Sequence, residues 1–188
     1  MAPTSPAPPL YIAFTAGVDK ASTDRVIATL IDALSKGTRE AHLMISTTGG
    51  GIMNGMTLFN FLRQFPVTLT TYNIGNVDSV GNVIFLAGER RIASPQSTFM
   101  FHGVAYNVTG PMSLAEPNLI EMLGVVQADQ NRMADIIAQR TQIARDDAAH
   151  LFSHAATKTA AEALAVGIIH EIAAPVVPPD ASVVLIAA

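Results

Sequence analysis

The stretch Gly75-Asn76-Val77-Asp78-Ser79-Val80-Gly81 joins an apolar, β-prone run at residues 67–72 to an apolar, helix-like run at residues 83–87. A serine in a sharp strand-to-helix turn holds its hydroxyl clear of the backbone, and the next backbone N–H is free to bind an oxyanion. A serine at such a turn can also be a simple helix cap. The stretch alone therefore leaves a catalytic and a structural serine open.

Strand-like and helix-like segments alternate along the whole chain. We expect strands at residues 10–15, 41–46, 67–72, 91–93 and 98–101, and helices at residues 22–36, 52–65, 113–141, 146–152 and 160–166. This alternation predicts an α/β fold with a mainly parallel sheet, which carries functional loops at the carboxyl ends of its strands. Three of the expected strands are followed by residues that can form such functional loops: residues 47–51, Ser79 and His102.

Each of these three features has a structural explanation when taken alone. The run Gly49-Gly50-Gly51 can be a tight turn or can bring backbone N–H groups to a bound carbonyl. His102 follows Phe99-Met100-Phe101, so it can be a buried core histidine. Together and in this order on an α/β pattern, the three features indicate a serine hydrolase.

Composition bounds the class of protein. The 188 residues suffice for one folded domain, and the 14% of charged residues is low for a soluble monomer, so we expect a homo-oligomer. The net charge of -4 and the absence of a basic cluster argue against a nucleic-acid partner. No apolar run is long enough to span a membrane, and the absence of cysteine excludes thiol chemistry and fits the cytoplasm.

The chain divides into three parts. Residues 1–9 are proline-rich and are expected to form a flexible leader, residues 10–172 form the α/β domain, and residues 173–188 form a C-terminal tail. The apolar segment at residues 183–186 can cover a sheet edge or meet a neighbouring subunit. The long helix at residues 113–141 has apolar residues on more than one face, so it is either a core helix or a projecting helix that packs on another subunit; we favour the second.

Four stretches together resemble the proteolytic subunit of the Clp protease, ClpP, over residues 11–172. They are Ser46-Thr47-Thr48-Gly49-Gly50-Gly51, the Ser79 turn, Met100-Phe101-His102 and Thr159-Ala160-Ala161-Glu162-Ala163. The resemblance implies the ClpP/crotonase-like spiral of ββα units with a projecting long helix. It also implies a serine-type peptidase that acts on peptide or unfolded protein and needs no cofactor.

The resemblance implies roles for individual residues. Ser79 would be the nucleophile, His102 the general base, and the N–H groups of Gly50 and Val80 the oxyanion hole. The loop at residues 103–110 and the long helix would bind extended peptide and join two rings of subunits.

The sequence also departs from the family pattern. Counting back from Thr159, the aspartate that completes the family's triad is replaced by Ala155, so the third member is unknown; His154, Ser153 and Asp78 are the substitutes considered. Thr48 stands where the family has proline, and Gly51 is an additional glycine. The leader has no counterpart of the family's N-terminal axial loops, so docking to a Clp unfoldase is doubtful.

Two other functions follow from these departures. Without the acid, the chain can be a catalytically weak or inactive relative that serves assembly or binding. A crotonase-type enzyme would use the same paired N–H groups on an acyl-CoA thioester, but no Lys/Arg group fits its phosphates. The histidines show no trusted metal-ligand spacing, so no metal is expected.

Overall fold

The computed structural model describes residues 7–106, 110, 113 and 115–187. Residues 1–6 of the expected leader and residues 107–109 of the expected peptide-binding loop lie outside them. The strands are β1 (Leu10–Thr15), β2 (Glu40–Thr47), β3 (Thr68–Asp78), β4 (Arg90–Ala93), β5 (Thr98–Met100), β6 (Thr157–Thr159), β7 (Glu171–Ile172) and β8 (Val183–Ala187). The helices are α1 (Lys20–Ser35), α2 (Ile52–Gln64), α3 (Gly81–Phe85), α4 (Glu116–Arg140), α5 (Arg145–Ser153) and α6 (Ala160–Ala165).

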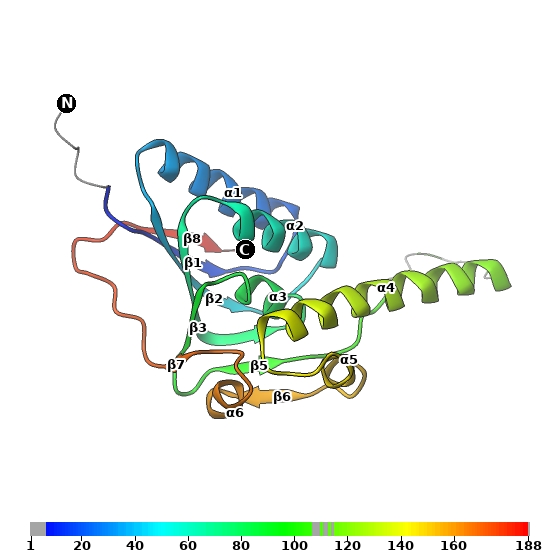
Figure 1. The fold of residues 1–188 in the computed structure, drawn as a ribbon. Helices are drawn as coiled ribbons and strands as arrows, with labels where there is room; N and C mark the ends of the chain where they lie inside the picture. Colours follow the sequence, from blue (N-terminus) through cyan, green and yellow to red (C-terminus); the bar gives the residue numbers. More distant parts are fainter. Residues whose placement is uncertain (1–6, 107–109, 111–112, 114, 188) are drawn as a thin grey trace.

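The sheet is mainly parallel, as the sequence predicted, and it runs in the order β6-β5-β3-β2-β1-β8 (Figure 1). The first half of β3 pairs with β4, while its second half, residues 76–78, pairs with β5. The strands β2, β3 and β5 are therefore neighbours and run parallel. Their carboxyl ends lie at one edge, where residues 47–51, Ser79 and His102 follow.

Strand β3 is longer than its sequence indicated. A strand over residues 67–72 was expected, with the turn beginning at Gly75, but β3 continues to Asp78 and the turn begins only at Ser79. The pairing with β2 passes through an irregularity, because Ile45 lies opposite Asn73 while Thr47 lies opposite Val77. The extra residues of β3 at this irregularity bend the ladder. They also interrupt the simple alternation of apolar and polar residues by which a strand is predicted from sequence.

Aromatic side chains fix the segment that leads to His102. Phe99 is buried and meets Phe85 of α3 edge to face, with ring centroids 5.0 Å apart. Phe101 is buried against Phe152 of α5 at 5.8 Å, and its N–H donates to the Ala156 carbonyl at 2.8 Å. Burial of rings of this size contributes strongly to stability, so the backbone before His102 is held on both sides.

A buried arginine ties the ends of three helices together. The guanidinium of Arg91 donates to the carbonyls of Ile168 at 2.7 Å, Gly88 at 3.2 Å, Arg140 at 3.0 Å and Gly167 at 3.1 Å. These carbonyls lie at or just after the C-terminal ends of α3, α4 and α6, where helix dipoles favour a cation. Burial lowers the pKa of Arg91 to about 10, so it stays charged at neutral pH.

The C-terminal tail takes part in the sheet. Strand β8 pairs in parallel with β1, with Tyr11 opposite Val183, so this segment covers a sheet edge. Arg25 of α1 donates to the carbonyls of Leu185 at 3.1 Å and Ala187 at 3.0 Å. These bonds occupy carbonyl groups that an edge strand would otherwise expose.

The long helix projects from the body, as expected, although it is shorter than predicted. Helix α4 begins at Glu116, with Pro117 in its first turn, and ends at Arg140. Figure 1 shows its N-terminal half extending beyond the rest of the fold. Its buried residues, Met133, Ala134 and Ile137, all lie in the C-terminal half. No helix among the described residues has the length and apolar character needed to cross a bilayer.

Candidate active site

Ser79 occupies a strained turn between β3 and α3. Its φ of 55° lies in the left-handed region that non-glycine residues rarely adopt. Its N–H donates to the Met100 carbonyl at 2.8 Å. The Asn82 side chain also bridges the turn, because its Nδ2 donates to the carbonyls of Ser79 at 3.1 Å and Met100 at 2.8 Å. These bonds offset the cost of a conformation that holds the hydroxyl at the sheet edge.

The glycine loop packs directly on Ser79. Gly49 has a φ of +85°, and a Cβ there would lie 2.7 Å from the Ser79 Cβ. Gly50 has a φ of +149°, and a Cβ there would lie 2.4 Å from the Val18 carbonyl oxygen. Both positions therefore require glycine, for conformation and for space. The loop is held to Val18, which donates to the Gly49 carbonyl at 2.8 Å and accepts from the Gly51 N–H at 2.7 Å.

Two backbone N–H groups among the described residues, one in the glycine loop and one in the Ser79 turn, have no protein acceptor. Within the described part of the chain, the N–H groups of Gly50 and Val80 donate to no protein acceptor. The Gly51 N–H is occupied by Val18, so the additional glycine does not compete with Gly50. Backbone N–H groups that have no protein acceptor can bind an oxyanion where they point at it together.

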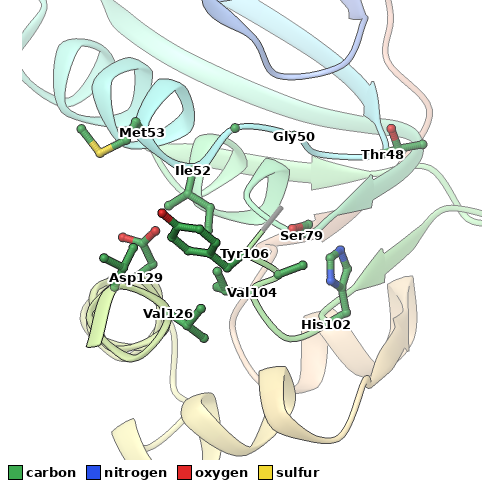
Figure 2. Close-up of a pocket in the computed structure, with 13 residues that line it drawn as sticks. Thr48, Gly50, Ile52, Met53, Ser79, His102, Val104, Tyr106, Val126 and Asp129 are labelled. Carbon is green, nitrogen blue, oxygen red and sulfur yellow. The ribbon is translucent and has the colours of Figure 1, made fainter. Parts of the chain in front are cut away.

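The imidazole of His102 lies near Ser79 on the same cleft (Figure 2). Its Nδ1 lies 2.8 Å from the carbonyl oxygen of Gly103. Because a carbonyl only accepts, this contact requires the proton on Nδ1 and leaves Nε2 as the basic nitrogen. Among the described residues, the Ser79 hydroxyl makes no hydrogen bond to His102. Catalytic hydrogen bonds are often long before substrate binds and shorten in the complex.

None of the three expected substitutes for the missing acid bonds to His102. The side chains of His154 and Ser153 bond to each other at 2.9 Å and are exposed. The Asp78 carboxylate accepts from Asn76 Nδ2 at 2.7 Å and does not line the cleft. The partner of Nδ1 is instead the Gly103 carbonyl, which no sequence pattern indicated, because every residue carries a backbone carbonyl.

Ala155, the position at which the resemblance implies the family's acid, is conformationally unusual. Ala155 has a φ of 50°, in the left-handed region, and is exposed. It follows the end of α5, whose C-cap is His154, and precedes β6. A side chain with a methyl group alone supplies neither charge nor a hydrogen bond there.

Ser79 and His102 open onto a cleft of about 700 Å³ between the glycine loop, residues 102–106 and helix α4 (Figure 2). Gly50 also lines the cleft, whereas Val80 is fully buried behind the turn. The other walls are largely apolar, with Ile52, Met53, Val104, Tyr106 and Val126. Across the described residues, no group of three or more His, Asp or Glu side chains is arranged to hold a metal.

Comparisons with known proteins bear on the family and the fold. The family model described as Clp protease matches residues 10–176. The ATP-dependent Clp protease proteolytic subunit 2 of Chlamydia trachomatis is 27% identical over 150 residues, which cover 78% of this chain and 72% of the relative. The ATP-dependent Clp protease proteolytic subunit 1 of Corynebacterium jeikeium is 28% identical over 111 residues, covering 55% of this chain and 54% of the relative.

A solved structure supports the same fold. A mutant of ClpP1 from Listeria monocytogenes superposes with a TM-score of 0.78 at 19% identity, covering 88% of this chain and 91% of that one. The α/β architecture expected from the sequence is thus the ClpP-like fold. Because the family match extends over most of the folded part, the chain belongs to the Clp protease family.

Proposed function

We propose that this chain is a serine-type peptide hydrolase with Ser79 as nucleophile and His102 as general base. The observation that carries the proposal is the convergence, on one cleft, of a strained serine, a histidine and an unpaired Gly50 N–H, with the Val80 N–H next in the chain. Gly49 leaves room for the loop to approach the serine closely. This combination serves acyl transfer and has no comparable use in a structural turn.

The proposed reaction proceeds in two halves. The Ser79 Oγ attacks the peptide carbonyl carbon while its proton passes to His102 Nε2, and the N–H groups of Gly50 and Val80 bind the resulting oxyanion. His102 then gives the proton to the peptide nitrogen, the C–N bond breaks, and an amine leaves. Water, deprotonated by His102, attacks the acyl-serine ester, and the second tetrahedral species releases the carboxylic acid and restores Ser79.

The Gly103 carbonyl takes part of the role of the missing aspartate in this proposal. It holds the Nδ1 proton and so presents Nε2 to Ser79. It carries no full charge, however, and stabilises the imidazolium less than a carboxylate does. We therefore expect activity well below that of a complete triad.

We also propose that the protein is assembled from copies of itself. Large apolar side chains on the projecting half of α4 are exposed: Leu119, Ile120, Leu123 and Val125. They lie on more than one side of a helix that extends beyond the body (Figure 1). An apolar surface of this kind on a projecting helix fits burial against a second copy of the chain.

The decisive experiment is labelling with a fluorophosphonate, read by mass spectrometry, with Ser79→Ala as control. We expect one label per chain that vanishes in the variant, together with loss of peptide cleavage, because only an activated serine hydroxyl attacks the phosphorus, with fluoride leaving, at a useful rate. Light scattering of both proteins should give the same mass, above that of a monomer.

The same experiment tests the competing hypothesis of an inactive assembly protein. Absence of labelling at neutral and mildly alkaline pH, with the assembled mass retained, would favour that hypothesis. Cleavage that persists in Ser79→Ala would contradict the proposed nucleophile. Membership of the Clp protease family argues against the crotonase-type alternative.

A further inference from the structure

One acidic side chain lies on the otherwise apolar wall of the cleft. Asp129 of α4 lines the cleft together with Val125 and Val126 of the same helix. These positions are three and four residues apart, so they share one helix face. Figure 2 shows the Asp129 carboxylate directed away from the helix axis, on the side where Tyr106 lies.

The Asp129 carboxylate is largely withdrawn from solvent and only partly paired. Its side chain is 15% exposed, and its Oδ1 accepts from Arg132 Nη2 one helical turn away. No described residue donates to its Oδ2. Arg132 is 46% exposed, and its guanidinium reaches Met53, with Nη2 3.9 Å from Sδ. Arg132 does not itself line the cleft, although its guanidinium contacts two residues that do, and the Oδ2 of Asp129 remains for a ligand.

We infer that Asp129 selects peptides that place a cationic side chain, lysine or arginine, in this part of the cleft. The inference rests on the proposed peptidase function and names its substrate class. The apolar wall formed by residues such as Val126 suits the methylenes of such a side chain, while the terminal cation reaches the carboxylate. An acidic substrate side chain would meet a like charge in a poorly solvated site and is excluded.

The expected size of the effect follows from the kind of bond. A hydrogen bond to a charged group changes kcat/KM by about 10- to 100-fold when its partner is removed. Arg132 competes for the same carboxylate, so we expect the lower end of this range. Removing Arg132 should therefore strengthen the preference, whereas neutralising Asp129 should remove it.

The test uses internally quenched peptides of neutral, apolar sequence. A lysine is moved through each position near the scissile bond, and each peptide is compared with one that carries norleucine at that position, which has a similar length and no charge. The readout is the ratio of kcat/KM for the two peptides. At one position we expect lysine to be favoured by about tenfold.

Three variants make the test specific. Asp129→Asn should bring this ratio close to one, and Arg132→Gln should raise it. Asp135→Asn is the matched control, because Asp135 lies on the same helix outside the cleft and pairs with Arg145 Nε at 3.1 Å. We expect the control to leave the ratio unchanged.

The outcomes separate this inference from the proposed function. Equal ratios at every position, in the unmodified protein and in Asp129→Asn, would overturn the inference while the peptidase function stands. A lysine preference that survives in Asp129→Asn would also overturn it. If no peptide is cleaved and Ser79 is not labelled, the proposed function fails and the inference fails with it.

Discussion

Replacing Ala155 with aspartate should increase the reactivity of Ser79. Strands β5 and β6 are antiparallel, with Met100 opposite Thr157, and the next pair is joined by the bond from the Phe101 N–H to the Ala156 carbonyl. Continuing this register brings Ala155 opposite His102. Residues directly opposite each other in antiparallel strands have Cβ atoms about 4.5–5.5 Å apart. We therefore expect a carboxylate at position 155 to come within reach of the His102 imidazole.

The expected gain in the reactivity of Ser79 can be estimated from the present hydrogen-bond partner of His102 Nδ1. A carboxylate would replace the neutral Gly103 carbonyl, and a charge-assisted hydrogen bond is roughly twice as strong as a neutral one. An additional stabilisation of about 1–2 kcal/mol as the imidazolium forms corresponds to about 5- to 30-fold in rate.

A comparison with asparagine at position 155 separates the effect of the added charge from the effect of relieved backbone strain. Ala155 has a φ of 50°, which costs an alanine about 1 kcal/mol, whereas Asp and Asn tolerate this region better. Both Ala155→Asp and Ala155→Asn should therefore unfold at slightly higher denaturant concentration than the unmodified protein. Only the aspartate should accelerate catalysis.

The assay is the second-order rate of fluorophosphonate labelling at Ser79, with kcat/KM on a peptide as a second readout. We expect the aspartate variant to react faster than both the asparagine variant and the unmodified protein. Equal rates for the two variants, both folded and both assembled, would refute the reasoning that position 155 faces His102.

Three further predictions concern stability. Gly49→Ala should destabilise the fold by about 2–4 kcal/mol in urea unfolding and abolish labelling of Ser79, because the added Cβ would lie 2.7 Å from the Ser79 Cβ at a positive φ. Gly124→Ala should instead stabilise the fold by up to about 1 kcal/mol in the same measurement, because a Cβ at this position of α4 meets nothing within 4 Å. Burial lowers the pKa of His42 and of His170 below the ordinary 6.5, so the unfolded chain takes up protons first as the pH falls, and the stability present above about pH 6.5 is lost below it. The melting temperature should fall between pH 7.5 and 5.5, and His42→Gln should make that fall shallower; an unchanged profile would contradict this assignment.

Much of the fold follows from local sequence patterns. The alternation of strands and helices and the projecting α4 are encoded in hydrophobic periodicity and were predicted. The extension of β3 to Asp78 was missed, because Gly75 and Asn76 read as a turn although both lie in β3, where the pairing with β5 begins at Asn76. Tertiary pairing overrides local propensity at such positions.

The candidate site also combines features that the sequence indicates with features that only the folded structure shows. Ser79, His102 and the glycine loop could be selected as candidates from the sequence, because their residue types are distinctive and follow neighbouring strands. The Gly103 carbonyl could not be found, since a backbone group leaves no mark in a sequence. Asp129 had a weak signal, as an acid three residues after an apolar wall residue such as Val126, but only the folded structure brings that helix face to the cleft.

The proposed site would separate two contributions of a catalytic acid that are normally combined. An acid opposite a catalytic histidine selects the tautomer, and it also supplies charge that stabilises the imidazolium. Here the Gly103 carbonyl can perform the first task alone, at 2.8 Å from Nδ1. The oxyanion donors are independent of both tasks, and such donors account for about 100- to 1000-fold of rate each. The proposed enzyme should therefore retain a well-ordered but slow site, in which transition-state binding by Gly50 and Val80 contributes more than the basicity of His102.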